Sequence, residues 1–308
     1  MVLEMSVKLV SDELGADIVA ISGVKHFSVE KTFDCGQCFR FDPVKNSKHE
    51  VEFSGIAYGR FISVAQDGDT VYIYNSSIED YENIWRHYLG LDEDYEVIMQ
   101  DIRSRSDNPA LDLAIRFGEG IRILHQEPWE AICSFIISQN NNIPRIKKII
   151  EKLSDQCGEP IDLPESLKSK ITEGRSLCAF PTPDALCRLG VDGLFELKTG
   201  FRAKYIFDAA SRAVSGQIDY EYLKNSQSTE ECIKELCKIK GVGPKVASCA
   251  LLFGFGKYDA FPIDVWIKKV ISKYFSDTAE KFSPEDLGRY AGIAQQYLFY
   301  YERYVNSK

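Results

Sequence analysis

Lys245 stands in a glycine- and proline-rich stretch, GVGPKVASC, at residues 241–249. Gly241 and Gly243 allow a tight turn whose backbone amides point outward, and Pro244 suits the first position of a helix. Because a helical pattern precedes this stretch, the sequence predicts a helix-hairpin-helix. Such a hairpin binds DNA phosphates without reading sequence, since exposed amides and a helix N-terminus favour an anion. A plain helix–helix turn is the alternative interpretation of the same residues.

The position of Lys245 also suits nucleophilic chemistry. In the first turn of a helix the macrodipole is positive, which disfavours an ammonium and favours the neutral amine. A neutral amine is a nucleophile, whereas a lysine that only binds phosphate has no need to lose its proton. Lys245 is therefore a candidate for attack on a substrate as well as for charge neutralisation.

Asp264 follows nineteen residues later in the stretch FPIDVWIKKVI, just before another predicted helix. N-capping of that helix is the ordinary role for an aspartate there, and it would also hold the carboxylate rigid. A lysine and a fixed carboxylate that face one cleft above DNA suit attack at a sugar carbon. The anion would then stabilise the positive charge that develops as the glycosidic bond breaks.

Two sequence patterns predict the elements that must position these residues. Residues 50–76 alternate apolar and polar side chains and contain an Asp67-Gly68 turn, which is typical of an antiparallel meander. From about Tyr95 onward the apolar spacing becomes helical. Helices are expected at residues 128–139, 143–153, 201–214 and 228–239, with an irregular connector at 157–184.

These elements predict an α+β protein in two parts. A small N-terminal antiparallel sheet domain is expected at residues 1–100, and a mainly helical body at residues 101–308. The helix-hairpin-helix would lie in the body, at about residues 228–255. The catalytic candidates therefore belong to the helical part.

The composition is that of a globular protein. The 308 residues are 44% apolar, and no apolar run approaches the roughly 20 residues that span a bilayer. The N-terminal segment lacks the basic and apolar parts of a signal peptide. The nine cysteines are an odd number without metal-site spacing, and the one close pair, Cys35 and Cys38, lacks a thioredoxin-like context. We expect an intracellular protein with free thiols, no catalytic metal and no other cofactor.

The net charge of −9 argues at first against a nucleic-acid partner. Its distribution matters more, because acidic residues concentrate at 78–96 whereas residues 145–152, 198–204, 234–245 and 267–273 are locally basic. Solvated helix faces explain each basic segment separately. Taken with the hairpin, the four segments predict a shared basic face.

Three further motifs extend the pattern: DCGQCFRF at residues 34–41, ISQNNNIPRI at 137–146 and YAGIAQQYLF at 290–299. With GVGPK and PID, they make the chain resemble the helix-hairpin-helix (HhH-GPD) DNA glycosylases, and more narrowly the 8-oxoguanine DNA glycosylases. The motifs span residues 34–299, and their order and separation disfavour chance agreement. No cysteine follows Cys249, so the iron–sulfur loop of endonuclease III and of the adenine glycosylases is absent.

The resemblance implies an enzyme that flips 8-oxoguanine out of duplex DNA, removes it and cleaves the strand. Lys245 and Asp264 would be catalytic, and the lysine would attack C1′ and form a Schiff base that permits β-elimination. The carbonyl of Gly36 would accept the N7 hydrogen that 8-oxoguanine has and guanine lacks, and Gln295 would bond the Watson–Crick edge. The implied lesion-base pocket comprises Gly36, Cys249, Pro262, Gln295 and Phe299. Ordinary core packing is the alternative role for Phe299 and Cys249.

The same resemblance implies a DNA-binding set. Asn140 would occupy the hole left by the flipped base, while Arg145 and Arg202 would grip the orphaned cytosine. The chain departs from the family at two positions: Phe201 stands where the family often has tyrosine, and Trp266 where a member of the family has a histidine near a phosphate. The implied DNA and opposite-base contacts are Asn140, Arg145, Phe201, Arg202, Gly241 and Gly243.

Two alternatives stay open. An alkylated-base DNA glycosylase on the same scaffold would use the aspartate, but it normally lacks the lysine and gives no role to Gly36. A non-catalytic helix-hairpin-helix DNA-binding protein would use Lys245 only to neutralise a phosphate. The expected partner is double-stranded DNA containing 8-oxoguanine, preferably opposite cytosine, with no membrane partner, and we expect a monomer. It would act in the cytoplasm at the nucleoid of a prokaryote, or in a eukaryotic nucleus.

Overall fold

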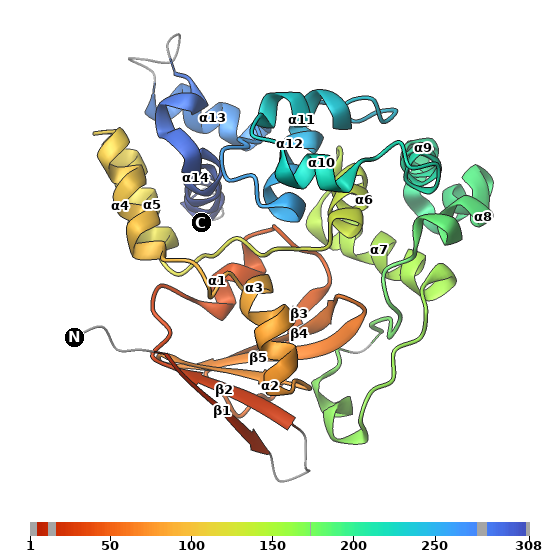
Figure 1. Ribbon diagram of the computed structural model, residues 1–308, viewed down its shortest axis with the longest axis horizontal. Coiled ribbons are helices and arrows are strands. Elements are labelled where there is room, and N and C mark those ends of the chain that lie inside the picture. The colour runs from red at the N-terminus through yellow and green to blue at the C-terminus, as the bar shows by residue number, and fades with distance from the viewer. Residues whose placement is uncertain (1–4, 12–16, 173, 276–281, 306–308) are drawn as a thin grey trace.

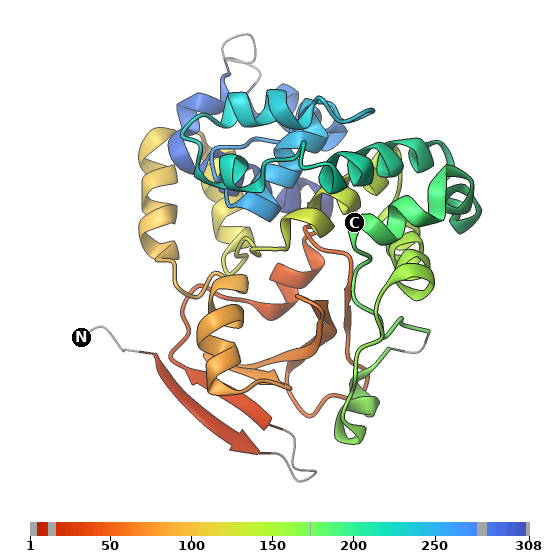
Figure 2. The same cartoon turned by 45° about the vertical axis from the view of Figure 1, so that its right-hand side comes forward.

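The computed structural model describes residues 5–11, 17–172, 174–275 and 282–305. In these residues the N-terminal part forms a six-stranded antiparallel sheet in the order β1-β2-β6-β5-β4-β3, with the helices gathered beyond one side of it (Figures 1 and 2). The strands are β1 Ser6–Ser11, β2 Asp17–Ser22, β3 Phe41–Pro43, β4 Val51–Ala57, β5 Arg60–Asp67 and β6 Thr70–Tyr74.

Tight turns set the register of the central meander. β4 pairs with β5 as far as Ala57 and Arg60, so Tyr58 and Gly59 form the turn, and both have positive φ. The turn between β5 and β6 contains Gly68, at a φ of +57°. Positive φ is typical of hairpin turns whose twist matches that of the strands. The meander predicted at residues 50–76 is confirmed.

The strands β1, β2 and β3 were not predicted. β1 is exposed along most of its length, and therefore lacks the alternation that marks a half-buried strand. β3 spans only three residues, which is too short for any period to show.

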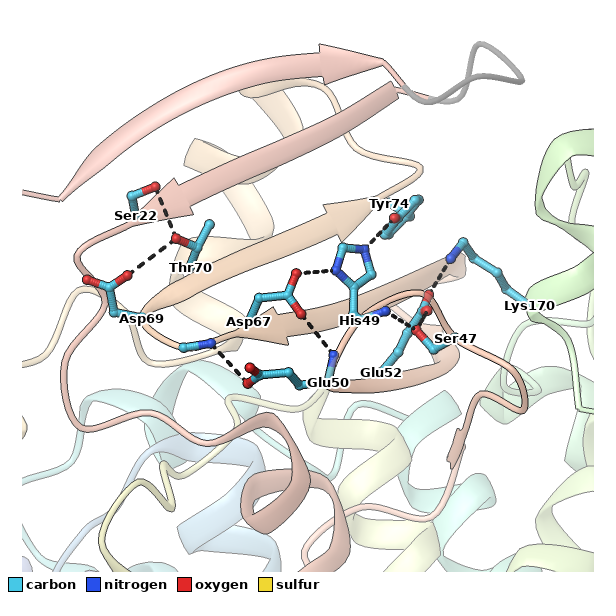
Figure 3. Close-up of polar contacts among 11 residues, drawn as sticks. Ser22, Ser47, His49, Glu50, Glu52, Asp67, Asp69, Thr70, Tyr74 and Lys170 are labelled. Atoms are coloured by element: carbon cyan, nitrogen blue, oxygen red, sulfur yellow. Dashed lines mark hydrogen bonds and ion pairs between the residues drawn. The ribbon is translucent and has the colours of Figure 1, made fainter.

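A buried ion pair joins the sheet to the chain that follows it (Figure 3). The carboxylate of Glu52 in β4 accepts hydrogen bonds from Lys170, Ser47 and Ser63. Burial alone would raise the pKa of Glu52, but these hydrogen bonds outweigh burial and lower it. Because Lys170 ends the 3-10 helix η2, the pair holds the predicted connector at residues 157–184 against the sheet.

The rest of the described chain is mainly helical. Short helices accompany the sheet: α1 Val29–Asp34, α2 Ile78–Asp80, η1 Tyr81–Trp85 and α3 Arg86–Tyr88. The body contains α4 Tyr95–Arg105, α5 Pro109–Gly118, α6 Pro128–Ser138, α7 Ile143–Cys157, η2 Glu165–Lys170, α8 Pro183–Leu194, η3 Phe195–Thr199, η4 Gly200–Arg202, α9 Ala203–Val214, α10 Tyr220–Asn225, α11 Thr229–Leu236, α12 Pro244–Phe255, α13 Val265–Tyr274, η6 Pro284–Tyr290 and α14 Ala291–Val305.

The helical body has its own apolar core. α12, which carries Lys245, packs against α6, α10 and α11, and α14 packs against α5 and α13. The helices predicted at residues 128–139, 143–153 and 228–239 are confirmed with shifted ends, and 201–214 divides into η4 and α9. The predicted fold class, an antiparallel sheet followed by a helical body, is confirmed.

The residues before α4 and those of α4 pack in different cores. η1 and α3 pack in the core of the sheet, whereas Tyr95, at the start of α4, packs in the core of the body. The predicted division at residue 100 stays a prediction. Within the described residues, no helix combines the length and apolar character needed to cross a membrane.

Candidate active site

The predicted hairpin is formed by α11, the loop that follows it and α12. Gly241 has a φ of +76°, and a Cβ there would stand 2.5 Å from the ring of Tyr205, so only glycine fits this turn. Gly243 is the N-cap of α12, with open space where its Cβ would be, and Pro244 takes the first helical position. The N-terminus of α12 is therefore unobstructed at the point where an anion would approach.

Lys245 lies in the first turn of α12 and is half-buried. Its Nζ is 5.8 Å from the centre of the Phe135 ring, which α6 contributes. One helical turn further along α12, Cys249 is buried. Burial raises the pKa of the Cys249 thiol, and a hydrogen bond and charge from Lys245 act in the opposite direction. The lysine head group therefore lies beside Cys249, close to the apolar surface of α6.

Asp264 is the N-cap of α13. Its Oδ1 accepts hydrogen bonds from the backbone amides of Trp266, at 2.9 Å, and Ile267, at 2.8 Å. The carboxylate is close enough to Cys249 for its negative charge to raise the pKa of that thiol. Lys245 and Asp264 thus each lie at a helix N-terminus with their charges acting on Cys249, and Pro262 is buried just before the cap of α13.

A second group of the predicted residues meets between α1 and α14. Gly36, with a φ of +85°, lies where a Cβ would stand 3.7 Å from Cε1 of Phe299 and 3.5 Å from Cδ1 of Ile143. Gln295 is one turn before Phe299 on α14 and only 5% exposed. Its amide makes no hydrogen bond with another residue in the part of the chain that the structure describes. The amide is not among the fully buried polar atoms that lack a partner, so it stays open to water or to a ligand.

The turn between α6 and α7 carries Asn140, which is exposed and has a φ of +47°, a region that asparagine tolerates better than most residues. The buried guanidinium of Arg202 holds this turn by donating to the carbonyls of Gln139, at 2.8 Å, and Asn140, at 3.0 Å. Burial lowers the pKa of Arg202, and the neighbouring charge of Arg145 lowers it further. The two predicted arginines therefore lie close to one another, at the base of the turn.

Phe201 projects beside this group. Its ring is 46% exposed, lies 4.3 Å from the guanidinium carbon of Arg202 and meets Tyr205 edge-on. Tyr205 also packs under Gly241, so the same side chain contacts both the Phe201 ring and the turn of the hairpin. An exposed aromatic ring is suited to stacking on a nucleic-acid base.

Three contributors to this arrangement were missed in the sequence: Gln126, Gln296 and Arg303. Gln296 donates to the carbonyl of Cys35, and Arg303 donates to that of Asp34, so both hold the loop that contains Gly36. Gln126 donates to the carbonyl of Gln37, the residue that follows Gly36. The only sequence signal was the doubled glutamine in YAGIAQQYLF, of which one member was assigned to the base pocket.

The close pair Cys35 and Cys38 is buried in the loop around Gly36. Burial raises the pKa of Cys35 to about 12 and that of Cys38 further. Thiols that stay protonated are poor nucleophiles, so the pair has the character of packing residues.

Comparison with known proteins agrees with this geometry. Residues 20–132 match the family described as 8-oxoguanine DNA glycosylase, N-terminal domain. Residues 133–287 match the HhH-GPD superfamily of base excision DNA repair proteins. The chain belongs to the 8-oxoguanine DNA glycosylase family.

Solved structures of relatives extend over the whole fold. The Clostridium acetobutylicum 8-oxoguanine glycosylase/lyase, solved with double-stranded DNA containing cytosine opposite 8-oxoguanine, is 37% identical with a TM-score of 0.85, covering 99% of this chain and 100% of that one. MBOgg1, solved with a low affinity DNA ligand, is 39% identical with a TM-score of 0.82, covering 98% and 100%. The N-glycosylase/DNA lyase of Saccharomyces cerevisiae is 32% identical over 204 residues, which is 63% of this chain and 51% of that protein. This chain thus spans about half the length of the yeast relative.

Proposed function

We propose that this protein is a base excision repair enzyme, a DNA glycosylase and AP lyase that removes 8-oxoguanine from duplex DNA. The observation that supports this most strongly is the placement of Lys245 and Asp264 at the N-termini of α12 and α13, with both charges acting on the buried thiol of Cys249, because it offers an amine nucleophile and a rigid carboxylate to one region. The C. acetobutylicum relative, which covers the whole chain, is described as an 8-oxoguanine glycosylase/lyase.

In the proposed reaction the neutral amine of Lys245 attacks C1′ of the damaged nucleotide. The bond from C1′ to the base breaks, and the base leaves with the bonding electrons and takes up the proton that the attacking amine loses. The C1′–O4′ bond of the resulting aminal then breaks, O4′ takes up a proton, and the nitrogen becomes an iminium on C1′ of the opened sugar. Loss of a proton from C2′ then expels the 3′ phosphate by β-elimination. The place of Lys245 in the first turn of α12, one helical turn before the buried Cys249, supports this role.

Asp264 would stabilise the positive charge that develops on the sugar as the base departs. Both backbone donors to the carboxylate use Oδ1, so Oδ2 takes part in neither capping bond. A group that caps a helix is already fixed in orientation and needs no reorganisation during the reaction.

The base itself would bind between Phe299 and Cys249. The unpaired amide of Gln295 supplies donors and an acceptor for the Watson–Crick edge. The backbone at Gly36, which lies against Phe299, would place its carbonyl at the N7 hydrogen of 8-oxoguanine. An alkylated-base glycosylase would need no acceptor there, so the position of Gly36 favours the oxidised purine.

On the opposite strand we propose a preference for cytosine. Arg145 and Arg202 lie together at the turn that carries Asn140, and guanidinium donors match the O2 and N3 acceptors of an unpaired cytosine. In the DNA-free protein Arg202 is bonded to that turn, so Arg145, which is exposed, is the arginine with the freer head group. Phe201 would act as an aromatic wedge beside them.

The protein would work as a monomer without a metal or other cofactor, in the compartment that holds the cell's DNA. The sheet domain would supply the Gly36 loop, and the body, from about residue 101, would supply the hairpin and the catalytic pair.

A comparison of duplex substrates tests the proposed function. Duplexes carrying 8-oxoguanine, guanine or a methylated adenine, each opposite its ordinary partner, are incubated with excess enzyme, and released base and strand breaks are quantified. We expect base release and strand cleavage on the 8-oxoguanine duplex only. Release of the methylated adenine without strand cleavage would support the alkylated-base alternative instead.

A further inference from the structure

The loop around Gly36 is held by a pair of glutamine side chains. Nε2 of Gln296 donates to the carbonyl of Cys35 at 3.0 Å, and Nε2 of Gln126 donates to the carbonyl of Gln37 at 2.7 Å. The carbonyl of Gly36, which lies between these two, accepts no hydrogen bond from any residue in the described part of the chain. The backbone is therefore fixed on both sides of one unoccupied acceptor.

The two glutamines connect the loop to the helices that form the rest of the site. Gln296 is 4% exposed and follows Gln295 on α14. The backbone amide of Gln126 donates to the carbonyl of Phe253 at 2.9 Å, which connects it to α12, the helix that carries Lys245. The position of the Gly36 carbonyl is thus set relative to both the base pocket and the nucleophile.

The side chain of Gln37 adds rigidity from within the loop. It donates to the carbonyls of Thr32 and Arg122, at 2.9 and 2.8 Å, and accepts from the amide of Leu124 at 2.8 Å. A glycine at a φ of +85° would otherwise be the most adaptable point of such a loop. With its neighbours bonded, the loop has few alternative orientations for the one free carbonyl.

We propose that Gln126 and Gln296 are positioning residues that determine discrimination between 8-oxoguanine and guanine by holding the Gly36 carbonyl in one direction. This rests on the proposed function. A fixed carbonyl accepts a hydrogen bond from the N7 hydrogen of 8-oxoguanine and meets the N7 lone pair of guanine, so it favours one base and repels the other. A carbonyl that can rotate away loses both the attraction and the repulsion, so the affinities for 8-oxoguanine and guanine become more similar.

Binding measurements in a Lys245→Gln background test this, because that variant leaves the bound duplex intact. Gln296→Met and Gln126→Met each remove an amide donor at similar side-chain volume. Dissociation constants are measured for duplexes with 8-oxoguanine, guanine or a tetrahydrofuran abasic analogue opposite cytosine. The discrimination is the dissociation constant for the guanine duplex divided by that for the 8-oxoguanine duplex. We expect each substitution to lower this ratio by about tenfold, because a tenfold change is about 1.4 kcal/mol, which is within the range of one hydrogen bond. Affinity for the abasic analogue, which has no base to read, should stay within about twofold.

Tyr274→Phe is the matched control, because it removes one hydrogen bond to Glu302 on the same helix α14, and among the described residues Tyr274 makes no hydrogen bond to the loop around Gly36. It should leave the ratio unchanged. Gln296→Asn, whose amide is one methylene too short, provides a further variant should a methionine substitution fail to fold. Unchanged ratios in folded glutamine variants would overturn the proposed positioning role while leaving the proposed function intact. A Lys245→Gln parent that binds guanine and 8-oxoguanine duplexes equally would instead contradict the proposed function.

Discussion

Gly36 lies against the ring of Phe299, so that a Cβ on Gly36 would stand 3.7 Å from Cε1 of the ring. Residues from the two ends of the chain thus form one wall of the proposed base pocket. This distance is an ordinary van der Waals contact, so glycine is not required there for space. It is required because the backbone has a φ of +85°.

Gly36→Ala should therefore act through the backbone. An alanine at this φ costs roughly 1–2 kcal/mol, and the loop will relax by rotating the peptide that carries the reading carbonyl. Excision of 8-oxoguanine should fall, while cleavage at a preformed abasic site is largely kept. Gly216→Ala is the control, since Gly216 also has positive φ, with open space around its Cβ. Equal losses of excision in both variants would indicate general destabilisation.

Asp264 has a capping role and a proposed catalytic role, and two substitutions separate them. Asp264→Asn keeps an acceptor oxygen for the amides of Trp266 and Ile267, so the melting temperature should change little while base release slows. Asp264→Ala should lose both functions, with about 1 kcal/mol of stability gone with the cap. Single-turnover excision and thermal melting measure the two effects. An unchanged rate in Asp264→Asn would leave the residue as a cap only.

Arg145 should control the preference for the opposite base. Adenine presents its amino donor to the guanidinium donors and leaves them unpaired, which costs about 1–3 kcal/mol for each group. The wild type should therefore excise 8-oxoguanine opposite cytosine at least roughly tenfold faster than opposite adenine.

Arg145→Ala should reduce that difference by slowing the cytosine duplex more. Lys148→Ala, which removes an exposed positive charge from the same helix α7, should slow both duplexes alike. Equal wild-type rates on the two duplexes would mean that Arg145 and Arg202 contact only backbone phosphate.

Acid should weaken the sheet through Glu52. Its pKa is lowered in the folded protein because the hydrogen bonds from Lys170 and two serines outweigh burial, so its contribution to stability is present above the unfolded value of 4.5. That contribution is lost as the pH falls through the lower folded value. Glu52→Gln should be clearly less stable than wild type at neutral pH, by roughly 3–5 kcal/mol if Lys170 remains buried and unpaired.

The stability difference between wild type and Glu52→Gln should then narrow below about pH 4.5, as chemical denaturation across that range would measure. Glu50→Gln changes an exposed carboxylate on the same hairpin and is the control. A difference that stays constant with pH would show that the carboxylate charge is not what stabilises the sheet.

Local features were predictable from sequence. The Asp67-Gly68 turn and the glycines of the hairpin impose backbone conformations that few other residues adopt, so these parts could be located without the fold. The same holds for Asp264, because its N-cap role depends only on the helix that follows it. The edge strands β1 and β3 could not be located, since one is exposed and the other is too short to show a period.

Contacts between distant segments were not predictable from residue patterns. The glutamine bonds to the loop around Gly36, and the grip of Arg202 on the turn that carries Asn140, depend on how α14, η4 and α6 pack. The resemblance to a family indicated which residues share a pocket, but not which side chains hold them. Arg202 is the clearest case, because the structure gives it a supporting bond network in addition to its predicted contact with DNA.

Borohydride trapping tests the central claim most directly. An 8-oxoguanine duplex is incubated with the protein and sodium borohydride, which reduces an iminium to a stable amine and leaves a covalent protein–DNA adduct. Lys240→Gln, which removes an exposed lysine beside the hairpin, keeps the proposed nucleophile, so its adduct should persist even where affinity falls. Wild type should form the adduct, and Lys245→Gln should form none while it still binds the duplex. An adduct formed by Lys245→Gln at the wild-type level would contradict the assignment of Lys245 as the nucleophile.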